Sequence, residues 1–211
     1  MAKLDLKKQY KHLYLPSAKE VQVVDVPALN FVMIDGAIEP GEGPGTSPEF
    51  GAAMQALYGA TYTLKFMSKL SKTNPLDYGV MTLEGLWSVG EGEFDINRKD
   101  KWVYTLMIMQ PDHISPEMFA EAVQQLKKKK GDNPAFDRLR FERWGEGLSM
   151  QIMHQGPYSE EPATVARMKA FAEQNGYRPR GRHHEIYMGD PRRGDPAKLK
   201  TVLRQPIEKA I

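Results

Sequence analysis

The sequence contains no cysteine among its 211 residues. This absence excludes disulfide bonds, thiol nucleophiles and zinc sites built on cysteine, and it is typical of proteins in a reducing compartment. The first residues lack the continuous apolar run of a signal peptide, and no stretch reaches the roughly 18 apolar residues that a membrane-spanning helix needs. We therefore expect a cytoplasmic protein without a membrane partner.

An excess of charge of either sign is also missing. The 29 basic residues nearly balance the 27 acidic residues, so the net charge is only +2. A balanced surface has no general field that attracts nucleic acid or an anionic membrane. The basic run at residues 127–130 is more typical of a solvated helix end than of a nucleic-acid contact. We expect no nucleic-acid partner.

Several motifs of catalysis and metal binding are absent. No Gly-x-Ser-x-Gly segment occurs, which argues against a serine hydrolase. The glycine-rich segment 41–45 lacks a following Gly-Lys-Ser/Thr and contains Pro44, which has no amide donor, so phosphate binding is not indicated. His183 and His184 are adjacent and would point to opposite faces of a strand, which makes them a poor chelating pair. We expect neither a metal nor a cofactor.

The pattern that is present indicates a duplicated module. Hydrophobic residues make up 41% and charged residues 27%, an ordinary composition for one compact unit or two fused half-domains. The order strand, strand, helix, strand, strand occurs twice, and segment 31–36 before the first helix resembles segment 151–156 before the second. We infer a leader (1–18), a first half (about 19–110), a connector helix (about 111–131) and a second half (about 132–211).

The expected elements follow from apolar periodicity and from turn and capping residues. Strands are expected at 21–26, 30–34, 78–87, 102–109, 138–144, 147–154, 182–188 and 199–203. Helices are expected from 46 or 47 to about 64, over 116–130, and from 159 to 174. A duplicated strand-helix-strand-strand module closes most simply as one antiparallel sheet across a pseudo-twofold axis. The expected fold is α+β, with helices on one face and a ligand groove on the other.

A carboxylate lies in the middle of the strand expected at 182–188. Alternation places His183, Glu185 and Tyr187 on one face, with His184 and Ile186 on the other. A carboxylate in mid-strand is unfavourable, so it lies either on a solvated sheet face or in a functional site. The pattern alone leaves both interpretations open.

Aromatic residues occur in or beside the expected strands, and these include all three tryptophans. Any one of them is most simply explained as part of the core. Their joint occurrence nevertheless favours an aromatic pocket around Glu185. The candidate ligand-binding residues are Trp87, Trp102, Trp144, Tyr158 and His183.

Four segments carry a resemblance to a known family: residues 81–87, 102–111, 146–158 and 183–193. With residues 198–206 they resemble the GyrI-like small-molecule-binding domain family, over nearly everything after about residue 18. Relatives in that family include DNA gyrase inhibitory proteins and the ligand-sensing domains of multidrug-responsive transcription regulators. The chain leaves no room for the separate DNA-binding domain of such regulators. We therefore expect a stand-alone member.

The resemblance implies a site and an activity. In the ligand-sensing relatives a buried glutamate on a central strand meets lipophilic, often cationic, compounds among aromatic walls, and Glu185 matches that position. Stand-alone members are associated with hydrolysis of cyclopropane-bearing, DNA-alkylating natural products, so the chain also resembles cyclopropanoid hydrolases. We expect a lipophilic aromatic ligand and a protective ring-opening hydrolysis. Non-catalytic multidrug binding, sequestration or sensing is the alternative, and modulation of gyrase by contact is a second one.

Hydrolytic ring opening requires a base for water and a donor for the oxygen that gains charge. We expect Glu185 to be the base, and Tyr187 and Tyr104 to be the candidate donors. Glu84 is a possible second carboxylate of the groove, contributed by the first half. An exposed sheet edge is compatible with either a monomer or a homodimer.

Overall fold

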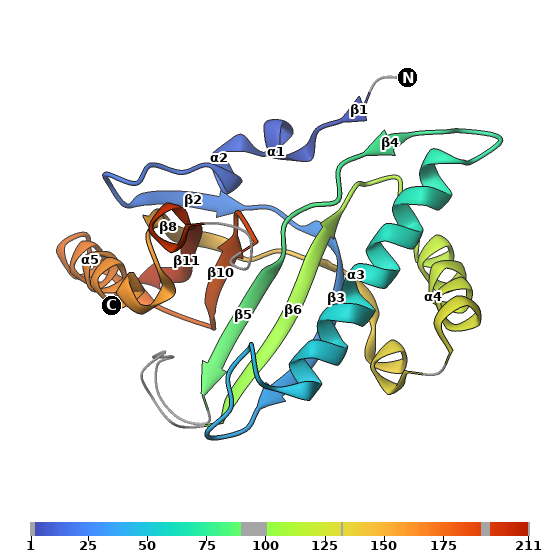
Figure 1. Ribbon diagram of the computed structural model, residues 1–211. Helices are drawn as coiled ribbons and strands as arrows, with labels where there is room; N and C mark the ends of the chain where they lie inside the picture. Colours follow the sequence, from blue (N-terminus) through green and yellow to red (C-terminus); the bar gives the residue numbers. More distant parts are fainter. Residues whose placement is uncertain (1–2, 90–100, 132, 191–194, 211) are drawn as a thin grey trace.

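The computed structural model describes residues 3–89, 101–131, 133–190 and 195–210. It is a mixed α+β fold in which a curled antiparallel sheet carries several helices (Figure 1). Within these residues, no helix is both long and apolar enough to cross a membrane.

Each half of the chain contributes the same order of elements, as the sequence predicts. The first half contains β2 (Gln22–Val26), β3 (Leu29–Ile38), α3 (Pro48–Lys69), β5 (Glu84–Val89) and β6 (Trp102–Gln110). The second half contains β7 (Arg140–Trp144), β8 (Gly147–Gln155), α5 (Glu161–Gln174), β10 (His183–Tyr187) and β11 (Lys200–Lys209). Helix α4 (Pro116–Lys130) connects the two halves.

Shorter elements complete the fold. They are β1 (Lys3–Leu4), α1 (Leu6–Gln9), α2 (Lys11–Tyr14), β4 (Asp77–Tyr78), β9 (Tyr177–Pro179) and the 3₁₀ turns η1 (Pro134–Arg138), η2 (Tyr158–Glu160) and η3 (Pro196–Lys198). The strand expected at 78–87 is thus divided, because only its two ends pair with other strands. Strand β11 extends six residues beyond the expected end at Leu203.

The main sheet has the strand order β2-β8-β11-β10-β5-β6-β3-β7, and β9 pairs with β11. The two halves meet at the centre, where β10 and β5 run antiparallel with Glu185 opposite Gly85. The outer strands are exchanged between the halves, because β2 of the first half pairs with β8 and β7 of the second half pairs with β3. This arrangement gives the sheet its pseudo-twofold symmetry.

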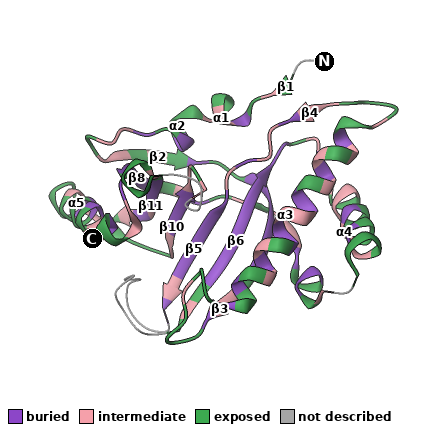
Figure 2. Ribbon diagram, in the orientation of Figure 1, coloured by how far each residue is buried: buried purple, intermediate pink, exposed green. Residues whose placement is uncertain are grey.

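Helices α3 and α5 cover one face of the sheet. Helix α3 packs on β3 and β6 through small residues such as Ala53, Ala56 and Ala60, all fully buried, and α5 packs on β8. Helix α4 lies outside α3 and is capped by Ser115, whose Oγ accepts a hydrogen bond from the Met118 amide at 3.3 Å. Figure 2 shows the central strands as buried and the outward side of α4 as exposed.

The opposite face of the sheet is occupied by the N-terminal segment. Leu13 and Tyr14 of α2 are almost completely buried there, and the Tyr14 hydroxyl donates a hydrogen bond to Glu84 of β5 at 2.7 Å. The expectation of a ligand groove on the face away from the helices therefore differs from the structure. The cavity described below lies on the helix face, between α5 and the centre of the sheet.

Candidate functional site

Glu185 lies at the centre of the sheet, on the face that carries the helices. Glu185 is only 6% exposed, which excludes the interpretation that it lies on a solvated face of the sheet. Its Oε2 accepts a hydrogen bond from the Tyr187 hydroxyl at 2.7 Å, and its Oε1 lies 3.4 Å from Nε2 of His183. The alternation expected from the sequence is therefore present, since these three side chains share one face.

A directed chain of hydrogen bonds ends on Glu185. The indole Nε1 of Trp87 donates to the Tyr187 hydroxyl oxygen at 2.8 Å. Because an indole nitrogen can only donate, the hydroxyl proton of Tyr187 remains for Glu185. Burial, followed by the charge of Glu185, raises the pKa of Tyr187 well above its usual value. Tyr187 is thus a neutral phenol that stabilises and orients the Glu185 carboxylate.

Gly85 makes this hydrogen-bond chain possible. It lies directly opposite Glu185 on β5, and the Trp87 side chain occupies the space above it. A Cβ atom at this position would lie 2.7 Å from Trp87 Nε1 and 3.3 Å from the Tyr187 hydroxyl. Only glycine leaves room for the indole nitrogen to reach Tyr187.

A second carboxyl group, Glu161, lies beside the first and was missed by sequence reasoning. It begins α5 and is only 3% exposed. Burial, and then the charge of Glu185, raises the pKa of Glu161 to about 9, although the neighbouring Thr201 hydroxyl opposes the rise. Glu161 therefore keeps its proton at neutral pH.

Tyr158 approaches the two carboxyl groups from the turn η2. Its ring meets that of Tyr187 edge to face, with centroids 6.0 Å apart. Burial, together with the charges of Glu161 and Glu185, raises the pKa of Tyr158 to about 12. The phenol is neutral at neutral pH and lies against the Tyr187 ring, and its role in ligand binding stays a prediction.

Trp87 belongs to a cluster of aromatic rings. It stacks with Phe50 of α3 at a centroid distance of 6.2 Å and meets Trp102 edge to face at 6.1 Å. Trp87 and Trp102 are therefore adjacent, as a pocket around Glu185 requires.

Tyr104 shares this face but is turned away from Glu185. It lies on β6, which β5 separates from β10, and Phe50 packs against its ring at 5.2 Å. Its hydroxyl lies over Gly36 of β3, where a Cβ atom would come within 2.2 Å of the oxygen. Burial raises the pKa of Tyr104 to about 12. Tyr104 is fully buried core, and the structure does not bring its hydroxyl to Glu185.

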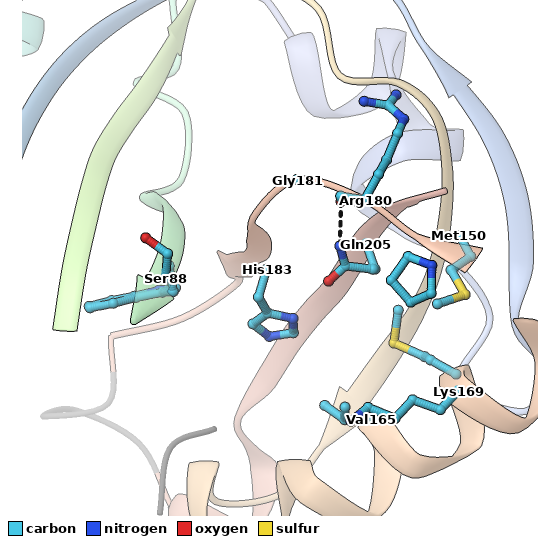
Figure 3. A pocket seen from close by; sticks show the side chains of 11 residues that line it. Ser88, Met150, Val165, Lys169, Arg180, Gly181, His183 and Gln205 are labelled. Carbon is cyan, nitrogen blue, oxygen red and sulfur yellow. Dashed lines mark hydrogen bonds between the residues drawn. The ribbon is translucent and has the colours of Figure 1, made fainter. Parts of the chain in front are cut away.

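A cavity of about 230 Å³ lies between α5 and the ends of β5 and β10. Figure 3 shows His183 between Ser88 of β5 and the α5 residues Val165 and Lys169. The far wall is formed by the 180–181 segment and by Gln205, whose side-chain amide donates to the Arg180 carbonyl at 2.7 Å. Glu185, Tyr187, Glu161 and Tyr158 together are called the Glu185 cluster. His183 and Trp87 line the cavity, and each also contacts a member of this cluster, so the cavity and the cluster are adjacent.

Two predicted site residues, Glu84 and Trp144, lie on the other face. Glu84 is opposite Ile186 in the β5–β10 register and therefore points away from Glu185. Its Oε2 lies 3.0 Å from His184 Nε2, and Trp144 meets the His184 ring at 6.3 Å. The structure does not bring either residue to the Glu185 cluster.

The side chains around His184 form a closed network of buried charges. His184 Nδ1 lies 2.9 Å from Glu146 Oε2, and Arg204 donates to the same oxygen at 3.4 Å and to the Leu13 carbonyl at 2.6 Å. Burial lowers the pKa of His184, but the stronger combined effect of Glu146 and Glu84 is to raise it. The network joins the N-terminal segment to the sheet.

Metal ligands are not gathered anywhere in the described part of the chain. No group of three or more histidine or acidic residues is arranged there to hold a metal ion. The Glu185 cluster, with its contacts Trp87 and His183, presents carboxyl, phenol, indole and imidazole groups.

Solved structures with the same fold include three from Listeria innocua. An uncharacterized conserved protein is 39% identical, with a TM-score of 0.86 over 97% of this chain and 100% of that chain. Two proteins named as hydrolases are 37% and 38% identical, with TM-scores of 0.82 and 0.85, and the matches cover 97% and 98% of this chain and all of theirs. The C-terminal domain of EcmrR, 15% identical, shares the fold with a TM-score of 0.54 over 90% of this chain and 98% of its own.

The sequence comparison agrees with the structural one. No match is found among curated proteins. The model of the GyrI-like small molecule binding domain matches residues 19–208, which include both halves of the sheet and the Glu185 cluster. The chain belongs to the GyrI-like small molecule binding domain family.

Proposed function

We propose that this protein binds lipophilic aromatic small molecules beside Glu185 and hydrolyses those that carry an activated cyclopropane, which protects the cell from alkylation. The observation that carries the proposal is the buried Glu185 carboxylate, which accepts a hydrogen bond from Tyr187 close to a cavity, while Trp87 in turn donates to Tyr187. Burial of a carboxylate is costly, and in soluble proteins such groups are concentrated at functional sites.

The cavity and its surroundings favour a compact, flat ligand. Its volume of about 230 Å³ is below the range of roughly 300–1,000 Å³ of most drug-sized pockets. Trp87 lines the cavity and meets Trp102, so the cavity wall on this side is aromatic. The same rings exclude bulk water from the Glu185 side.

Glu185 acts as the base in the proposed reaction. The water oxygen bonds to a ring carbon of the cyclopropane while Glu185 takes a proton from that water. The carbon–carbon bond of the ring breaks, and its electron pair passes into the conjugated carbonyl, whose oxygen then takes a proton from a donor. Tyr187 positions the base, because its own proton is directed to Glu185.

The relatives named as hydrolases support a hydrolytic activity for this chain. They match it over their full length at 37% and 38% identity. The choice of ring opening comes from the resemblance to stand-alone members of the family, and the Glu185 cluster offers a general base for such a reaction.

A binding function without catalysis is the second candidate. An ionised carboxylate among indole and phenol rings also suits a lipophilic cation, through charge and cation–π attraction. Ligand charge separates the two functions, since a cation-binding protein prefers cations whereas the hydrolase accepts a neutral electrophile.

The test follows ring opening of a neutral cyclopropane-dienone compound by mass spectrometry, in wild type and in Glu185→Gln. Glu160→Gln is the matched control, because Glu160 is an exposed carboxylate close to the site. The hydrolase function is supported if Glu185→Gln loses turnover but still binds the ligand, while Glu160→Gln keeps wild-type turnover. If wild type does not turn the compound over but binds lipophilic cations through Glu185, the protein is a binding protein and hydrolysis is refuted.

A further inference from the structure

Trp87, Tyr187 and Tyr104 do not supply the proposed reaction with an acid. The Trp87 indole proton is directed to Tyr187, and the Tyr187 proton is directed to Glu185. The Tyr104 hydroxyl lies over Gly36 of β3, three strands from β10. None of these groups has a proton free for the substrate oxygen that gains charge.

Glu161 has the properties that such an acid requires. It is 3% exposed, and its Oε1 has no hydrogen-bond partner among the described residues. Thr201 Oγ1, next to it on β11, is likewise buried without a partner in this part of the chain, and Thr201 lies opposite Tyr187 in the strand register. Thr201 thus places Glu161 beside Tyr187, and a polar group of a ligand would satisfy the Glu161 Oε1 atom.

The two carboxyl groups cannot both be ionised at low energy, because like charges in a buried site repel strongly. The surrounding contacts decide which group keeps the charge. Glu185 accepts a charge-stabilising hydrogen bond from Tyr187 and contacts His183, whereas Glu161 Oε1 accepts none. These contacts favour the proton on Glu161, whose pKa burial raises, although α5 begins at Glu161 and a helix N-terminus favours an anion.

We propose that Glu161 is the catalytic acid of this site. This inference rests on the proposed function. In one turnover Glu185 takes a proton from water, the water oxygen bonds to the ring carbon, and Glu161 gives its proton to the carbonyl oxygen as the ring bond breaks. The proton gained by Glu185 then returns to Glu161, which restores both groups.

The titratable groups that face Glu161 set the expected pH dependence. They are Glu185 and Tyr187 of β10 and Tyr158 of η2. His154 of β8 lies farther along α5, where it forms a hydrogen bond with Thr164, one turn after Glu161. Glu161 must be protonated to act, so turnover is present below its pKa of about 9 and declines as the pH rises through that value.

The experiment compares kcat and its pH profile in wild type, Glu161→Gln and Tyr158→Phe, with Glu160→Gln as control. Glutamine has the shape of a protonated glutamate but cannot transfer its proton, so we expect kcat to fall by ~10²–10⁴-fold with little change in KM. The decline of kcat above about pH 9 in wild type should disappear from the residual activity of Glu161→Gln. Unchanged kcat in Glu161→Gln, or loss of the decline in Tyr158→Phe instead, would overturn the proposal.

An infrared difference spectrum tests the location of the proton without relying on turnover. Wild type minus Glu161→Gln at neutral pH should show the carbonyl band of a protonated carboxylic acid, whereas wild type minus Glu160→Gln should not. Absence of that band overturns the assignment of Glu161 as the acid, whatever the turnover. If the band is present and wild type is inactive, the proposed hydrolysis and this catalytic role both fail, while the protonation of Glu161 stands.

Discussion

Substitution of Gly85 by alanine should displace the Trp87 indole and so disrupt the hydrogen bonds that lead to Glu185. The added Cβ would lie 2.7 Å from Trp87 Nε1 and 3.1 Å from its Cε2, and both atoms belong to a rigid indole that Phe50 packs against. The ring must move away, which breaks its hydrogen bond to Tyr187. Overpacking of this kind costs about 1–3 kcal/mol, which corresponds to a decrease in Tm of about 2–12 °C for a chain of this length.

Thermal unfolding, tryptophan fluorescence and turnover together measure the effect. Gly85→Ala should lower Tm, shift the tryptophan emission and reduce turnover, because Tyr187 loses the donor that directs its proton to Glu185. Gly51→Ala is the control, since Gly51 lies in helix α3 and a Cβ there meets no atom within 4 Å; it should stabilise by about 0.5–1 kcal/mol.

A double-mutant cycle with Trp87→Phe makes the test specific. Phenylalanine removes the indole nitrogen that the new Cβ meets, so the two substitutions together should cost less than the sum of their separate effects. Strict additivity, or a Gly85→Ala protein with wild-type Tm and emission, would refute the reasoning.

Three further predictions concern the buried charges. Tyr187→Phe should lower kcat more than it raises KM, because it removes the donor that orients Glu185; steady-state kinetics check this, and a pure KM effect contradicts it. Arg204→Met should reduce the free energy of unfolding in urea by about 3–5 kcal/mol, since it removes one partner of a buried charge network; a loss within the error of the measurement contradicts it. Because the folded-state pKa of Glu161 is raised to about 9, wild type loses stability as the pH rises from the unfolded pKa toward 9, and Glu161→Gln should flatten this decline in unfolding experiments; a decline as steep as that of wild type would contradict the prediction.

The sequence predicted the elements well where the signal was local. Alternation over 183–187 placed His183, Glu185 and Tyr187 on one face, and Ser115 with the following acidic and apolar pattern predicted α4 at its observed bounds. These features depend on strand pleating, helix periodicity and capping, which neighbouring residues determine.

The parts of the site that were not predicted depend on pairing between distant strands. Glu84 and Trp144 point away from Glu185 because of the β5–β10 and β3–β7 registers, which cannot be read from either strand alone. Glu161 resembles an ordinary acidic residue in the first turn of a helix, and only its burial next to Glu185 distinguishes it. Gly85 is likewise ordinary until Trp87 is placed above it.

The exchange of outer strands between the halves has a consequence for how such a chain can be divided or can have arisen. A separate first half would retain β3, β5 and β6 but would leave β2 without β8, and it would expose the β3 edge that β7 covers. Two copies of one half could satisfy each other by the same exchange. The fold therefore has the form of a domain-swapped homodimer fused into one polypeptide, with the two copies since specialised: the second supplies both carboxyl groups and the first supplies Trp87 and Gly85.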